Sequence, residues 1–154
     1  MVTPFAFVAG APSLDFCNTA GAAGPYRRDD ALAGFPDLVR WARQAGLLGA
    51  AEARRLLRAA GTRAALRRAR ALREAAYRLF TARAGRRPLP RADLRLLNRE
   101  LSRALARRRV RPDAAWGWDA DPRPGRLLWP VVENAAELLA SPAFAGVRVC
   151  GNPT

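Results

Sequence analysis

Apolar residues recur along most of the chain at the spacing of α-helices, every three or four positions. Residues that begin or end helices bound five such stretches, which predict helices over residues 36–48, 50–60, 62–84, 90–107 and 130–140. A weak two-residue alternation over Phe5–Val8 predicts a short strand, and Trp-Gly-Trp at 116–118 predicts a short strand or hairpin. We therefore expect a mainly α single domain of roughly five helices, with small antiparallel β elements at these two places.

The longest predicted helix separates into an apolar arc and a charged arc, and one arginine falls on the wrong side. Arg73 lies inside the apolar arc, where an unpaired guanidinium would be very costly, so it should meet a carboxylate or a bound anion. We expect Asp15 to be its partner; the alternative is that Arg73 extends past the apolar edge into solvent. The apolar arc consists of Leu66, Ala69, Leu72, Ala76, Tyr77, Leu79 and Phe80.

The peptide LDFCNT, residues 14–19, concentrates hydrogen-bonding groups between apolar residues. Such a cluster has one of two roles. It connects a strand-to-loop transition to the helices through hydrogen bonds, which is the interpretation we favour, or it lines a small polar pocket. In the second reading Asp15, Asn18, Thr19 and Arg73 would bind a small anionic ligand. Cys17 is expected to be a core residue, since no activating base is near it in the sequence.

The charge of the chain brings nucleic acid into consideration. The net charge is +14, with 27 basic residues against 13 acidic ones, and every basic residue is arginine. Codon bias in a GC-rich genome explains the choice of arginine over lysine, but it does not readily explain the excess of cations. Two interpretations of the densest basic run are possible: it is a solvated helix end, or it contacts phosphate. Its arginines are Arg107, Arg108, Arg109 and Arg111.

Several protein classes are disfavoured by what the sequence lacks. It contains no histidine, which removes histidine-dependent nucleophilic triads and histidine metal sites, and it has neither a dinucleotide fingerprint nor a phosphate loop. We therefore expect that the protein is not an enzyme. No apolar run reaches the length of a membrane span, and the N-terminus lacks the basic start of a signal peptide, so we expect a cytoplasmic protein without a membrane partner.

Five stretches, taken in order, carry a resemblance to a known family. The chain resembles bacterial proteins in which an N-terminal ABATE domain precedes a CGNR-type zinc finger. Each stretch is weak alone, but their order and spacing cover almost the whole chain. The stretches are LDFCNT, DLVRWARQAGLL, RARALREAAYRLFTARAG, ADLRLLNREL and LLWPVVENAAELLASPAFAGVRVCGNPT.

The resemblance implies a stress-induced transcription regulator. Residues 1–145 would be the helical ABATE-like domain, and residues 146–154 would be the start of a truncated zinc finger in which Cys150 matches the first zinc ligand. A structural zinc site needs four ligands, so residues 1–154 should not hold zinc stably. DNA would be contacted through the missing finger, and a homodimer is left open. We expect a regulatory domain that senses a ligand, or alternatively a stand-alone anion-binding module without specific DNA contact.

Overall fold

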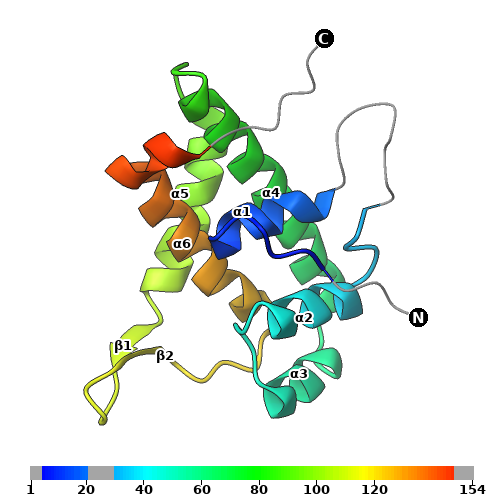
Figure 1. The fold of residues 1–154 in the computed structure, drawn as a ribbon. Coiled ribbons are helices and arrows are strands. Elements are labelled where there is room, and N and C mark those ends of the chain that lie inside the picture. The colour runs from blue at the N-terminus through cyan, green and yellow to red at the C-terminus, as the bar shows by residue number, and fades with distance from the viewer. Residues whose placement is uncertain (1–4, 21–29, 148–154) are drawn as a thin grey trace.

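The computed structural model describes residues 5–20 and 30–147, and within them the fold is mainly α-helical, as predicted (Figure 1). The α-helices are α1 (Pro12–Cys17), α2 (Phe35–Gln44), α3 (Ala50–Leu57), α4 (Thr62–Ala84), α5 (Arg91–Leu105) and α6 (Trp129–Ala140). The 3-10 helices are η1 (Asn18–Ala20), η2 (Pro124–Leu128) and η3 (Pro142–Gly146). The strands are β1 (Arg108–Val110) and β2 (Trp116–Trp118).

Helix α4, the longest element, is the centre of the packing. It contacts α1, α2, α5 and α6, and α1 lies across α4 in Figure 1. Its buried face consists largely of alanine and leucine, with Ala69, Leu72 and Leu79 fully buried. Alanines let neighbouring helices approach closely, while the leucines supply the buried apolar area. Tyr77 is wrongly predicted as buried: it stands at the edge of the apolar arc and is 45% exposed.

Helices α2 and α3 form a hairpin of two helices at one end of the bundle (Figure 1). Asp37 accepts a hydrogen bond from the backbone N–H of Gly34 (2.8 Å), which fixes the start of α2. Gly46 ends this helix with a φ of +72°, and the amide of Leu47 donates to the carbonyl of Ala42 (2.9 Å). This is a Schellman ending, which needs a residue free to adopt a left-handed conformation. The close turn places α3 directly beside α2.

The predicted strand at Phe5–Val8 is wrong, because these residues are not in a strand and pair with no strand of the described chain. The amide of Phe5 donates to the side chain of Gln44 instead (3.0 Å), and the amides of Val8 and Ala9 donate to Asp15. LDFCNT is likewise not a strand-to-loop transition. Pro12 supplies a fixed φ at the start of α1, and the peptide continues as one short α-helix followed by η1.

The β element around Trp-Gly-Trp is confirmed as an antiparallel hairpin. Residue Arg108 pairs with Trp118, and Val110 pairs with Trp116. A Cβ at Gly117 would lie 2.6 Å from the side chain of Arg111, so that side chain would have to shift to admit a larger residue. Trp118 packs on Trp129 with ring centroids 5.6 Å apart, which anchors the hairpin to α6. Among the described residues, no helix is long and apolar enough to cross a membrane.

Candidate functional site

Arg73 is buried and paired with a carboxylate, which was one of the two interpretations of the sequence, but Asp15 is not its partner. Only 3% of the residue is exposed, so it does not extend into solvent. Its two terminal nitrogens donate to the two carboxylate oxygens of Asp30, at 2.7 and 2.6 Å, and one of them also donates to the hydroxyl of Thr19 (3.1 Å). A two-pronged pair of this kind matches the planar geometry of both groups.

The electrostatics of this pair favour both charged forms. Burial alone would raise the pKa of Asp30, but its hydrogen bonds with Arg73 and the backbone of Leu32, together with the positive charge of Arg73, hold that pKa below its usual value. Burial would lower the pKa of Arg73, and Asp30 reverses that shift. Arg70 adds hydrogen bonds to the carbonyl of Leu32 at 2.7 and 3.2 Å. The two arginines therefore fasten the segment before α2 to α4.

The structure brings together only two of the four residues predicted to bind an anion. Thr19 contacts Arg73 directly, whereas Asp15 faces the N-terminal segment and accepts hydrogen bonds from the amides of Val8 (3.0 Å) and Ala9 (2.9 Å). Both amides donate to the same oxygen of Asp15, Oδ1, which ties this carboxylate to the N-terminal segment, while Arg73 pairs with Asp30. Asn18 is exposed. Binding of an anion at Arg73 stays a prediction, and the ligand would have to displace Asp30.

Cys17 lies beside this cluster and behaves as a core residue. It is buried, and its sulfur is 3.8 Å from the carbonyl oxygen of Arg73. Burial raises the pKa of the Cys17 thiol to about 12. The thiol is therefore protonated at neutral pH and is a poor nucleophile.

The basic run that follows α5 lies largely on the hairpin, where Arg108 is held on both sides. Its guanidinium donates to both carboxylate oxygens of Glu133 on α6, at 2.9 Å each. The same group lies over the ring of Trp118, 4.3 Å from the ring centroid. Such a doubly held cation anchors the hairpin.

The other arginines of this run also lie near carboxylates. Arg109 pairs with Asp119 (3.1 Å), and Arg111 pairs with Asp113 (2.8 Å). Arg107 is close enough to the carboxylate of Asp121 to lower its pKa, although Arg123 is the main cause of that shift. Phosphate contact at the run remains a prediction, in which phosphate has to compete with these carboxylates.

A second basic segment has no such partners. We name the four exposed arginines at the end of α3 and the start of α4 the α3–α4 arginine segment: Arg55, Arg58, Arg63 and Arg67. None of them makes an ion pair within the part of the chain that the structure describes. Residues 53–73 contain no acidic residue at all, and Glu52, the carboxylate on α3, is paired with Arg126. The positive charge of this segment is therefore directed at solvent.

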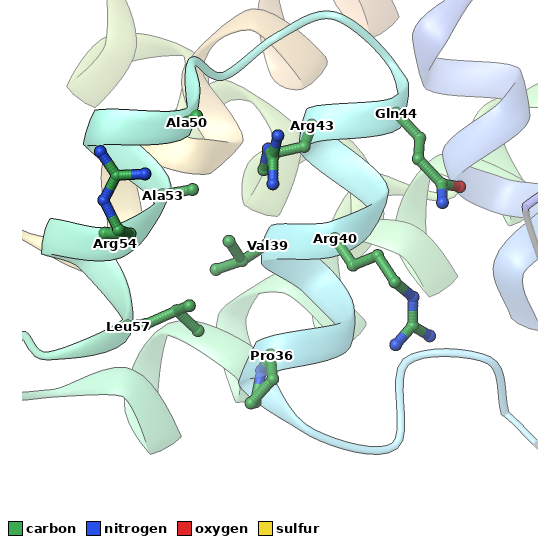
Figure 2. Close-up of a pocket in the computed structure, with 9 residues that line it drawn as sticks. All are labelled: Pro36, Val39, Arg40, Arg43, Gln44, Ala50, Ala53, Arg54 and Leu57. Atoms are coloured by element: carbon green, nitrogen blue, oxygen red, sulfur yellow. The ribbon is translucent and has the colours of Figure 1, made fainter. Parts of the chain in front are cut away.

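An open groove lies between α2 and α3, with a volume of about 440 Å³. In Figure 2, Val39 of α2 and Ala53 and Leu57 of α3 converge on the space between the helices, with Arg43 near its upper end. Val39 and Ala53 are 2% and 3% exposed and form the floor, whereas Leu57 is 46% exposed. The complete lining is Pro36, Val39, Arg40, Arg43, Gln44, Ala50, Ala53, Arg54 and Leu57.

This groove was not predicted from the sequence. The spacing of Val39 and Arg43 on one helix gives no information on which residues of the next helix face them. One signal was nevertheless present in the sequence: basic residues without any nearby acidic residue over residues 53–73.

Metal binding finds no support in the described residues, which contain no group of three or more cysteines, aspartates or glutamates placed to hold an ion. Cys150 lies outside the described residues, as does most of the predicted zinc-finger start at 146–154. The zinc site therefore stays a prediction from the family resemblance.

The fold and its surface define a mainly helical domain whose described residues include exposed arginines without an ion pair. The model of the ABATE family, described as "Putative stress-induced transcription regulator", matches residues 10–142. The chain belongs to the ABATE family. No curated protein and no solved structure matches it.

Proposed function

We propose that the chain is the N-terminal regulatory domain of a bacterial DNA-binding transcription regulator that acts in the cytoplasm. Specific DNA contact would come from a zinc finger that starts near Cys150 and takes its other ligands from beyond Thr154. The helical domain would add sequence-independent attraction to phosphate and would respond to a small ligand. Membership of the ABATE family supports the regulatory role.

One observation carries the DNA part of this proposal: the α3–α4 arginine segment has exposed charges and no ion-pair partners among the described residues. Arginines that are already paired gain little from phosphate, because a carboxylate has to be released first. Free arginines gain from phosphate by releasing the counterions condensed on DNA. The segment also lies in a stretch, residues 53–73, that contains no acidic residue, so we expect it to attract DNA.

The test is a titration with a short duplex at two salt concentrations. If the four arginines neutralise four phosphates, the association constant should fall about 100-fold between roughly 50 and 200 mM salt. Replacing Arg55, Arg58, Arg63 and Arg67 with glutamine should remove most of that salt dependence. Tight binding that is insensitive to salt would contradict the proposal.

A matched control exists on α5 and in the segment just before it. The exposed arginines Arg87, Arg91, Arg95 and Arg99 recur there at every fourth position. Replacing these four with glutamine changes the net charge by the same amount. The same helix carries Asp93 and Glu100, which pair with Arg78 and Arg68, whereas residues 53–73 contain no acidic residue. The control should weaken DNA binding less; equal losses in both variants would mean that only net charge matters.

The alternative function is an anion-binding module without specific DNA contact. It predicts that the intact chain shows no salt-dependent affinity for duplex DNA while still binding a small anion. The groove between α2 and α3 is the observation that keeps this alternative open.

A further inference from the structure

We propose that the groove between α2 and α3 binds a small organic anion with an apolar body, which would lie on Val39 and Leu57 while its acidic group meets Arg43 and Arg54. The inference rests on the sensing role in the proposed function and assigns a site to it. This site differs from the Arg73 cluster that the sequence pointed to. It is formed by two helices joined through a close turn, so both walls are rigid elements.

The apolar half of the argument comes from the floor and the side of the groove. Val39 and Ala53 are almost completely buried, yet both line the groove, and Leu57 leaves 46% of its surface in water. A half-exposed leucine beside a concave apolar floor gains by contact with an apolar group. Phosphate alone, or the backbone of a duplex, would leave this surface unused.

The acidic half of the argument comes from the charges. No carboxylate belongs to the lining, which includes three arginines. Arg40 is already engaged, since it pairs with Asp37 (3.0 Å) and lies over the ring of Phe5 (5.1 Å). Arg43 and Arg54 are exposed and form no ion pair in the described part of the chain. A ligand with one acidic group would find two cations without competitors.

The size of the groove decides between a small molecule and a macromolecule. A volume of about 440 Å³ lies within the range of roughly 300–1,000 Å³ that is typical of small-molecule sites. The side chains of another helix would need a longer apolar surface than Val39, Ala53 and Leu57 provide. We therefore commit to a small carboxylate or phosphate ester with an aromatic or aliphatic body.

Calorimetric titration with 2-naphthoate tests the inference, because this probe combines one carboxylate with an apolar body. The intact chain should bind 2-naphthoate at least tenfold more tightly than 2-naphthamide, which has the same body without the charge. Replacing both Arg43 and Arg54 with glutamine should weaken naphthoate binding at least tenfold. The matched control, Arg95→Gln with Arg99→Gln, removes the same charge on α5, away from the groove, and should change naphthoate binding less than twofold.

Three outcomes would overturn the inference: no binding of naphthoate by the intact chain, equal losses in the two double variants, or displacement of naphthoate by duplex DNA. Leu57→Asn provides a second check that does not alter charge, and it should weaken naphthoate and naphthamide alike. Circular dichroism of each variant verifies the fold. Failure here is separate from failure of the proposed function, which is judged by the salt dependence of DNA binding in the unmodified chain.

Discussion

Two arginine-rich regions of this molecule have opposite surroundings. The run at 107–111 is the denser one in the sequence, yet Arg108, Arg109 and Arg111 all pair with carboxylates. The α3–α4 arginine segment is more dispersed, yet its four arginines have no ion-pair partner among the described residues. The density of cations along a chain is therefore a poor guide to free charge. The position of the carboxylates in the folded structure decides where charge is available.

We expect the largest effect when the buried arginine, Arg73, loses its carboxylate partner. Asp30→Asn removes the charge that Arg73 faces and leaves a guanidinium that is 3% exposed without its main partner. Breaking a buried pair costs about 3–5 kcal/mol, and because the Asp30 side chain is 34% exposed we expect about 2–3 kcal/mol. Urea unfolding measures the loss of stability.

The control for this prediction replaces both partners. Asp30→Asn combined with Arg73→Met removes the unpaired charge and should recover part of the lost stability. If Asp30→Asn alone changes the free energy of unfolding by less than about 0.5 kcal/mol, then the pair does not hold the segment before α2 to α4.

Acid should destabilise the regions in which arginines pair with carboxylates before it affects the regions without such pairs. Hydrogen bonds from the side chain of Arg123, which outweigh the effect of burial, lower the pKa of Asp121 to about 2. A carboxylate with a lowered pKa contributes stability that is present above its unfolded pKa of about 3.9 and is lost as the pH falls toward the folded value. We expect a loss of about 1–2 kcal/mol from Asp121 between pH 4 and pH 2, reduced because Arg123 is largely exposed.

Unfolding in urea at a series of pH values measures this effect. Asp121→Asn should be less stable than the unmodified chain at pH 6 and should lose less stability on acidification. If the difference between the two proteins is the same at pH 6 and pH 2, then ionisation of Asp121 does not contribute to folding.

Two single variants compare a paired arginine with an unpaired one, and the expected change in stability is smaller. Arg108→Gln removes a bidentate pair and a ring contact and should cost about 1–2 kcal/mol of stability. Arg58→Gln makes the same change of charge at an exposed and unpaired site, where we expect less than about 0.5 kcal/mol. Thermal unfolding separates the two variants. Equal effects would remove the distinction between paired and unpaired arginines.

The sequence predicted helices α2 to α6 but not α1, because amphipathic spacing in long helices such as α4 and α5 reflects local geometry and burial together. It also placed Arg73 on the apolar face of α4, since the position of a residue on a helix face follows from periodicity alone. It could not identify Asp30 as the partner, because Asp30 is 43 positions away and its place depends on how the segment before α2 folds back. Asp15 looked suitable only while its own backbone partners, Val8 and Ala9, were unknown.

The prediction of an N-terminal strand was wrong, and the groove was not predicted, for a related reason. Alternation at Phe5–Val8 predicts a strand only if another strand pairs with it, and that partner is a property of the whole fold. The groove depends on the angle and register between α2 and α3, which residues such as Val39 and Leu57 do not specify alone. Both cases concern contacts between elements rather than the elements themselves.

The smallest expected effect concerns the dense basic run itself. Arg109→Gln combined with Arg111→Gln removes two cations that already face Asp119 and Asp113. Phosphate would have to replace those carboxylates, so the affinity for a short duplex should fall less than twofold at roughly 100 mM salt. The matched variant, Arg58→Gln with Arg63→Gln, removes two unpaired cations and should reduce affinity severalfold. A larger loss from the Arg109 and Arg111 variant would show that surface carboxylates yield readily to phosphate, and the run at 107–111 would then be the better candidate for DNA contact.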